Sequence, residues 1–195
     1  MTRDWRDISY LTVGNPRQRR AHEGLCKLGI LHALADFDPV LASTVNIDID
    51  IESSDLDIIC EAVDLQAFEA RLRELYGAMR GFVCDRVPRD PEAVVASFWF
   101  EGWEYEVFGQ ALPVDQQNAY KHLTQTSRVI ARGGERWREA IRGLKRRGLK
   151  TEPAVAYCLR LEGDPYIAVL ALEGISDDAL DLMLAQGPHD HDSSV

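Results

Sequence analysis

Two aspartates spaced two residues apart, Asp55 and Asp57, are the residues of this chain best suited to do chemistry. Leu56 and Ile58 alternate with them, which is the pattern of a strand with one buried face. Residues two apart on a strand project from the same face, so the two carboxylates would lie side by side. Carboxylate oxygens are ligands for hard divalent cations such as Mg²⁺ or Mn²⁺. The pattern therefore predicts a metal site.

A run of small residues ending in hydroxyls precedes the aspartates by about a dozen residues and reads Leu41-Ala42-Ser43-Thr44. We interpret it as a turn whose backbone N–H groups and side-chain hydroxyls contact a phosphate beside the cation. Ser54, directly before Asp55, is a further small polar candidate for the same phosphate. The combination predicts metal-assisted phosphoryl or nucleotidyl chemistry.

A third acidic ligand is expected on a neighbouring strand, because two-metal nucleotidyl transfer clamps the attacking and leaving oxygens between cations roughly 3.5 to 4 Å apart. The stretch 103–108 alternates apolar residues with Glu104 and Glu106, which share a face. We favour Glu106 as the metal ligand, with Glu104 as the alternative because it lies nearer to the predicted hairpin turn. The competing interpretation is the solvated face of an ordinary antiparallel sheet.

The acidic residues also permit simpler interpretations. The alternation over 47–52 is typical of a half-buried strand or hairpin arm, and acid-rich strand ends are common. A calcium-binding EF-hand loop is excluded, because Ser53 stands where the sharp turn needs glycine and Ile59 where a bidentate glutamate is required.

Composition bounds the class of protein. The chain has 195 residues and is 46% apolar, enough for one sizeable core or a compact domain with a helical appendage. It has no apolar run long enough to span a membrane and no signal-peptide layout at its N-terminus, so we expect a soluble, cytoplasmic protein. The four cysteines are far apart, which favours reduced and mostly buried thiols over a zinc ribbon or a redox pair.

Charge is strongly segregated along the chain. The net charge of −10 argues against a long nucleic acid as partner, and no Lys or Arg occurs over 28–70. Nine basic residues fall over 128–150, against Glu135 and Glu139. This basic stretch is interpreted either as a solvated helix face or as a phosphate-facing wall opposite the carboxylates.

Periodicity and turn residues predict an α+β protein with a mixed sheet. We expect an α/β core over 1–112, a helical C-terminal part over 113–187 packed on it, and a disordered tail over 188–195. Helices are predicted from Asn15-Pro16 to about 35, over 64–76 with Asp64 as N-cap, and in several pieces over 114–187. Strands are predicted over 39–45, 55–61, 82–87, 94–100 and 103–108, with the last two joined by a tight turn at Glu101-Gly102.

Four further polar residues are candidates for binding phosphate or nucleotide. Arg17 lies at a predicted helix N-terminus, where anions are favoured, although a plain surface charge is the simpler interpretation. Asn118, Lys121 and His122 share one side of a predicted helix. Lys121 would take a terminal phosphate and His122 would accept a proton, although a single histidine is more often a structural hydrogen-bonding residue.

The spacing of these motifs resembles the signature of the nucleotidyltransferase superfamily, in which a small-residue turn is followed about ten residues later by alternating acidic and apolar residues. Ser43 matches the second small position and Asp55 to Ile58 the acidic one, whereas Ala42 replaces the preferred glycine. The chain also resembles an uncharacterised bacterial family, domain of unknown function 4269, over about 14–166. That resemblance rests on the stretches Ser-Asp-Leu-Asp-Ile-Ile-Cys-Glu, Phe-Gly-Gln, Gln-Gln-Asn-Ala-Tyr-Lys-His and Gly-Leu-Lys-Thr-Glu-Pro-Ala.

These observations favour a Mg²⁺- or Mn²⁺-dependent nucleotidyltransferase that binds a nucleoside triphosphate and modifies a small-molecule or protein acceptor. One alternative is a phosphohydrolase that uses the same site with water as acceptor. The other is a catalytically silent nucleotide-sensing or protein-binding module, which Ala42 supports because its methyl group restricts the turn.

Overall fold

The computed structural model describes residues 3–189 and contains two compact units, each described here by itself. The first unit consists of the residues up to Asn46 together with Ser53–Tyr120. The second consists of Ile47–Glu52 together with the residues from Lys121 onward. The predicted α+β class is confirmed. Within residues 3–189, every helix is too short or too polar to cross a membrane.

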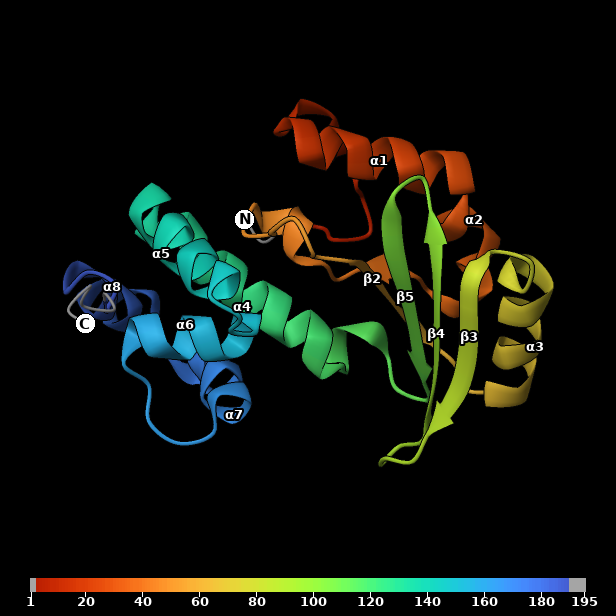
Figure 1. Ribbon diagram of the computed structural model, residues 1–195. Helices are drawn as coiled ribbons and strands as arrows, with labels where there is room; N and C mark the ends of the chain where they lie inside the picture. The colour runs from red at the N-terminus through yellow and green to blue at the C-terminus, as the bar shows by residue number, and fades with distance from the viewer. Residues whose placement is uncertain (1–2, 190–195) are drawn as a thin grey trace. The chain divides into compact units, whose positions relative to one another are not determined.

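One five-stranded mixed sheet forms the centre of the first unit, in the order β1-β2-β5-β4-β3 (Figure 1). Only the β2–β5 pair is parallel, and the other three pairings are antiparallel. The tight turn predicted at Glu101-Gly102 joins β4 to β5, and both its residues have positive φ, at 49° and 81°. The strands are β1 (Val40–Leu41), β2 (Leu56–Glu61), β3 (Arg80–Val87), β4 (Ala93–Phe100) and β5 (Trp103–Gln110).

The helices of the first unit are α1 (Pro16–Leu28), α2 (Ile30–Ala33) and α3 (Leu65–Tyr76). Among them, α1 and α3 begin where the sequence predicts. The Asn15 side chain accepts hydrogen bonds from two backbone N–H groups, and Gln18 completes a capping box with it. The Asp64 side chain also accepts hydrogen bonds from two backbone N–H groups, at the start of α3. The predicted long helix is divided at Gly29, whose φ of 67° ends α1 in the left-handed conformation.

The core of this unit lies on one face of the sheet. Leu56 and Ile58 of β2, and Tyr105 and Val107 of β5, are fully buried in a cluster that also contains Phe68 of α3. Alternation along the strands therefore leaves Asp57, Glu104 and Glu106 on the opposite face. The packing of the apolar residues is what fixes the direction of the acidic ones.

The predicted helical region is confirmed and supplies most of the second unit. Its helices are α4 (Asn118–Gly133), α5 (Glu135–Arg146), α6 (Thr151–Leu159), α7 (Pro165–Leu170) and α8 (Asp177–Ala185). Lys150 is the N-cap of α6. Of the predicted tail over 188–195, residues 190–195 lie outside the described part of the chain. The backbone N–H of His189 donates to the carbonyl of Cys158 at 2.9 Å.

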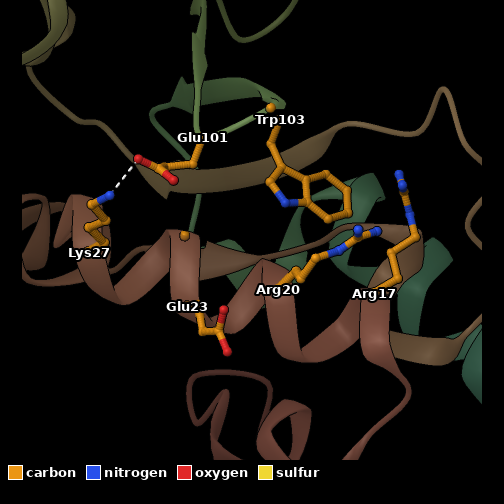
Figure 2. A pocket seen from close by; sticks show the side chains of 8 residues that line it. Arg17, Arg20, Glu23, Lys27, Glu101 and Trp103 are labelled. Atoms are coloured by element: carbon orange, nitrogen blue, oxygen red, sulfur yellow. Dashed lines mark hydrogen bonds and ion pairs between the residues drawn. The ribbon is translucent and has the colours of Figure 1, made fainter.

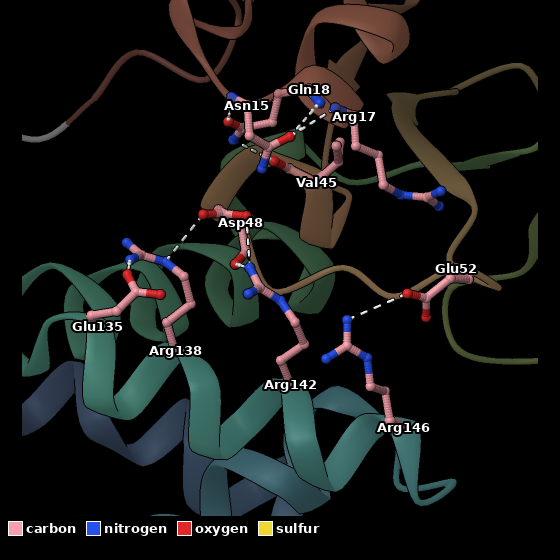
Figure 3. A network of polar contacts seen from close by, with 10 residues as sticks. All are labelled: Asn15, Arg17, Gln18, Val45, Asp48, Glu52, Glu135, Arg138, Arg142 and Arg146. Carbon is pink, nitrogen blue, oxygen red and sulfur yellow. Dashed lines mark hydrogen bonds and ion pairs between the residues drawn. The ribbon is translucent and has the colours of Figure 1, made fainter.

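Two strand predictions are wrong. The predicted strand over 39–45 is only two residues long, because Thr44–Ile47 turns into a 3₁₀ helix. The alternating stretch Ile47–Glu52 is neither a strand nor a hairpin arm, and Asp48 adopts a positive φ of 57°. Side chains of α5 hold this stretch within the second unit. Arg142 donates to the Asp48 carboxylate at 2.7 Å, and Arg146 lies 3.3 Å from Glu52 (Figure 3).

The predicted burial of most cysteines is confirmed. All four cysteines are free thiols, and Cys60, Cys84 and Cys158 are buried whereas Cys26 is exposed. Burial in apolar surroundings raises the pKa of Cys60 and of Cys84.

Candidate functional site

Asp57 and Glu106 are direct neighbours across the parallel pair β2–β5. Their Cα atoms are register partners, so both side chains project from the same face of the sheet. Both residues are half-buried. Asp55 directly precedes β2, two residues before Asp57, and is also half-buried. The structure therefore brings together backbone positions that lie about fifty residues apart in the chain.

Other polar and aromatic residues share this face, which we name the carboxylate face and define by Asp57, Glu104, Glu106, Ser97 and Trp99. Ser97 of β4 pairs with Glu106, and Trp99 pairs with Glu104. The exposed fraction of Trp99 is 40%, whereas Trp103 and Trp137 are buried at 6% and 2%. Glu104 lies two residues nearer to the hairpin turn, before the β2–β5 pairing begins at Leu56 and Tyr105. Glu106 is therefore the glutamate directly opposite Asp57.

Two residues of the small-residue turn donate hydrogen bonds to the backbone carbonyls of the aspartates. The backbone N–H of Ala42 donates to the carbonyl of Asp57 at 2.8 Å, which extends the β1–β2 pairing by one residue. Ser43 is fully buried, and its hydroxyl donates to the carbonyl of Asp55 at 2.7 Å. In this arrangement the Ser43 hydroxyl positions the backbone at the start of β2. Thr44 is half-buried at the first position of the 3₁₀ turn, and its predicted phosphate contact remains a prediction.

Arg17 reaches the same end of β2 from α1. Its Nη2 donates to the carbonyl of Ser54 at 3.1 Å, one residue before Asp55. The guanidinium carbon lies 4.2 Å from the ring centre of Trp103, a cation–π distance. Arg17 is therefore a positioned side chain, and not a plain surface charge.

The predicted metal ligands are of the type that Mg²⁺ prefers, but they are too few to form a complete coordination shell. Within residues 3–189, no group of three or more His, Cys, Asp or Glu side chains is arranged to hold a metal ion. Magnesium, however, is usually held by one or two carboxylates together with substrate phosphates and water, not by a complete protein cage. The adjacent carboxylates of Asp57 and Glu106 meet that smaller requirement.

The three predicted nucleotide contacts on α4 differ in their surroundings. Asn118 is the exposed first residue of the helix, and Lys121 is half-buried. His122 lies between two acceptors of the second unit: its Nε2 is 3.0 Å from the carbonyl of Tyr166, and its Nδ1 is 3.4 Å from Glu152. This geometry gives His122 a structural role in joining α4, α6 and α7.

Several arginines of the basic stretch over 128–150 form ion pairs within the second unit. Arg128 and Arg132 of α4 form ion pairs with Asp177 of α8, at 2.8 and 2.9 Å, and Arg132 also pairs with Asp181. On α5, Arg138 and Arg142 share Asp48, and Arg138 also pairs with Glu135 (Figure 3). Most of its arginines are thus neutralised inside the second unit, by acids that lie far away in the sequence.

The sequence did not indicate two features of the first unit, the pocket at Arg20 and the exposure of Trp99. Arg20, next to the predicted Arg17, lines a pocket that no motif indicates (Figure 2). Trp99 is the exposed member of a set of tryptophans that the sequence alone cannot rank. The alternation along β4, with Phe98 and Ala96 facing the core, is the signal that would have placed Trp99 outward.

Comparison with known protein families decides the relationship of the chain. Residues 23–172 match the family described as "Domain of unknown function (DUF4269)". The chain belongs to this family. The matched DUF4269 region contains the small-residue turn and both strands of the candidate site, and it begins within α1, after Arg17 and Arg20. A comparison with curated proteins finds no match.

Proposed function

We propose that this DUF4269 protein is a metal-dependent nucleotidyltransferase that binds a nucleoside triphosphate on the carboxylate face. The observation that carries the proposal is the pairing of Asp57 with Glu106 on adjacent parallel strands. The resemblance of the Ser43 to Ile58 spacing to the nucleotidyltransferase signature supports it. The exposed indole of Trp99 on the same face supports a ligand with a flat base, because bases stack on aromatic rings.

In the proposed reaction, an oxygen of the acceptor attacks the α-phosphorus, the bond from that phosphorus to the α–β bridging oxygen breaks, and pyrophosphate leaves. Asp57 and Glu106 hold the cation, and Asp55 accepts the proton of the acceptor. When bound, Mg²⁺ offsets the negative charge that the phosphates carry and develop. Ser43 fixes the start of β2 through its hydrogen bond to Asp55, and so holds the base in place.

A catalytically silent nucleotide-binding module is the second candidate. Two observations favour it: Ala42 replaces the glycine of the signature, and the Ser43 hydroxyl is buried and donates to the protein's own backbone. Such a module would bind nucleotide and metal without turnover.

Binding of metal and nucleotide is measured first. The full chain is titrated with Mn²⁺ by electron paramagnetic resonance, with and without each of ATP, GTP, CTP and UTP. Thermal unfolding follows in parallel, because a ligand at ~100 times its Kd adds roughly 2.7 kcal/mol to the stability of the native state. Asp57→Asn should weaken Mn²⁺ binding, whereas Glu61→Gln, four residues further along β2, should leave it unchanged. Absence of binding for every pair would overturn the proposal.

Turnover is measured next with nucleotides labelled at the α-phosphorus, incubated with a small-molecule extract or with protein acceptors. Label in a new adduct supports transfer. Label only in the free nucleoside monophosphate indicates the phosphohydrolase, and binding without any product indicates the silent module.

A further inference from the structure

One further row of residues adjoins the carboxylate face at the end away from the β4–β5 hairpin. Successive rows on one side of a sheet lie two residues, or roughly 7 Å, apart along the strands. In this row Phe108 of β5 pairs with Val95 of β4, and both are half-buried. Gln110, two residues further along β5, is only 5% exposed. The accessible side of the sheet therefore extends over three rows, those of Trp99, Glu106 and Phe108.

Arg89 lies over the last of these rows. It belongs to the loop between β3 and β4, at the opposite end of the strands from the β4–β5 hairpin (Figure 1). Its guanidinium carbon is 5.2 Å from the ring centre of Phe108, a cation–π distance. Within residues 3–189 it makes no hydrogen bond or ion pair, not even with Asp90 or Glu92 of the same loop. Its charge therefore stays available to a ligand on this side of the sheet.

A second arginine lies at the hairpin end of the same side. The guanidinium carbon of Arg80 is 5.5 Å from the ring centre of Trp99, its register partner on β4. A Cβ atom at Gly81 would lie 3.2 Å from Cδ1 of that ring, so the indole packs over the backbone of β3. Arg80 and Gly81 thus hold Trp99 in place, while 40% of it stays exposed for stacking with a base.

The charges along β5 distinguish the two ends. Glu104 is the register partner of Trp99, so the hairpin end carries a carboxylate as well as an arginine. In the row of Phe108, the neighbouring positions of β2 and β4 are apolar, and the acidic residue of that row, Asp85, lies on the edge strand β3. Phosphates that extend along β5 are therefore repelled toward Glu104 and attracted toward Arg89.

We propose that Arg89 binds the terminal phosphates of the nucleoside triphosphate, which lies along β5 with its base at Trp99 and its polyphosphate at Phe108. The inference rests on the proposed function and deepens it, because it assigns the direction of the nucleotide and a preference for triphosphates. Asp57 and Glu106, the proposed metal ligands, occupy the middle row, between the base and the terminal phosphates. A guanidinium suits the terminal phosphate, because its planar set of N–H donors matches the phosphate oxygens.

Inorganic tripolyphosphate isolates the phosphate end, because it has no base. The full chain is titrated with tripolyphosphate and Mn²⁺ by isothermal titration calorimetry. Arg89→Gln should weaken this binding about tenfold or more, the loss expected for a hydrogen bond to a charged group. Arg80→Gln is the matched control, since it removes the same charge from above an aromatic ring at the other end, and should change the affinity less than about threefold.

Both variants should keep the wild-type melting temperature, because both arginines are exposed. An equal loss of tripolyphosphate affinity in the two variants, or a larger loss in Arg80→Gln, would overturn the proposal.

Whole nucleotides test the direction of binding. With Mn²⁺, the wild-type chain should bind ATP more tightly than AMP, and Arg89→Gln should remove most of that difference while the affinity for AMP changes less than about twofold. Trp99→Leu should weaken ATP and AMP alike, by about fivefold or more, and leave tripolyphosphate binding unchanged. A loss of tripolyphosphate affinity in Trp99→Leu as large as that in Arg89→Gln would contradict the assigned ends.

The same titrations separate this inference from the proposed function. If ATP binds and Arg89→Gln has no effect on its affinity, the proposed function stands and the inference fails. If tripolyphosphate binds through Arg89 while no nucleoside triphosphate binds, the phosphate site stands and the proposed function fails. If neither tripolyphosphate nor any nucleoside triphosphate binds, both are overturned.

Discussion

Asp57 and Glu106 face each other across the parallel strands β2 and β5, although the chain builds a helix and two further strands between them. The parallel register matters, because it places the acidic position of one strand directly beside that of the other. A shift of one residue would turn Glu106 into the core and bring Tyr105 or Val107 out of it. The apolar residues on the far face therefore specify the pairing of the carboxylates.

Removing either carboxylate of this pair should weaken metal binding. We expect Asp57→Asn and Glu106→Gln each to weaken Mn²⁺ affinity at least about tenfold, because each leaves a single charged ligand. The unfolding free energy should stay within about 1 kcal/mol of wild type, since both side chains are half-buried on a polar face. Mn²⁺ titration and urea denaturation measure the two quantities. Retention of full affinity by both variants would contradict the metal assignment.

Gly109 is required by the packing of Phe68. A Cβ atom at Gly109 would lie 2.2 Å from the Phe68 ring, which is fully buried. We expect Gly109→Ala to destabilise the first unit by about 1 to 3 kcal/mol through overpacking. The same change in a Phe68→Leu background should cost less, because the smaller side chain makes room. A double-mutant cycle by urea denaturation gives the interaction energy, and strict additivity would rule out this contact as the cause.

Gln18 links the start of α1 to the segment after β1. Its Oε1 accepts from the Asn15 backbone at 3.0 Å, and its buried Nε2 donates to the carbonyl of Val45 at 2.8 Å (Figure 3). We expect Gln18→Ala to cost about 2 to 3 kcal/mol, since two hydrogen bonds are lost and a buried carbonyl is left unpaired. Glu23→Ala, on the exposed side of the same helix, is the control and should change stability by less than about 0.5 kcal/mol. Chemical denaturation distinguishes them.

The Arg6–Asp38 pair should make stability depend on pH at the acidic end. Arg6 donates to both Asp38 oxygens, at 2.8 and 2.5 Å, and thereby holds the pKa of Asp38 below its ordinary value of 3.8. A lowered carboxyl pKa gives stabilisation that is complete above the ordinary value and is lost as the pH falls through the folded pKa.

We therefore expect Arg6→Gln to be less stable than wild type at pH 6, by less than about 1 kcal/mol because the pair is exposed. The difference should disappear as the pH falls below 3.8 toward the lowered pKa. Urea denaturation across this range measures it, and a difference that grows on acidification would contradict the assignment.

His122 should act as a structural residue of the second unit. Loss of its contacts with Tyr166 and Glu152 in His122→Ala should lower the unfolding free energy by about 1 to 2 kcal/mol. Thermal unfolding measures this, and a variant with wild-type stability would contradict the structural role. A matching loss of nucleotide affinity would instead support the phosphate-binding role predicted from its position on α4.

Local signals in the sequence predict much of the first unit. Asn15 and Asp64 satisfy the first N–H groups of their helices, so the capping residues mark the helix starts without any knowledge of the fold. Glu101-Gly102 predicts its hairpin for a similar reason, because the turn depends on its own two residues. The acidic and apolar alternation likewise places Asp57 and Glu106 on one face.

Long-range partners explain what the sequence does not predict. The stretch Ile47–Glu52 alternates like a strand, but Asp48 is bound by Arg138 and Arg142, about ninety residues away. Ser43 looks like a phosphate ligand in the sequence, whereas its nearest acceptor is the carbonyl of Asp55. The pocket at Arg20 depends on where the β4–β5 hairpin meets α1, and no local pattern reports that meeting.

The arginines of α4 and α5 also change how the net charge should be understood. Because Asp48, Asp177 and Asp181 are held against them, a polyanion approaching this helical unit would meet carboxylates beside these guanidinium groups. Raised ionic strength should accordingly weaken the ion pairs between α4 and α8 more than it would release a bound partner. A heparin column should therefore retain this protein poorly, despite the nine basic residues over 128–150.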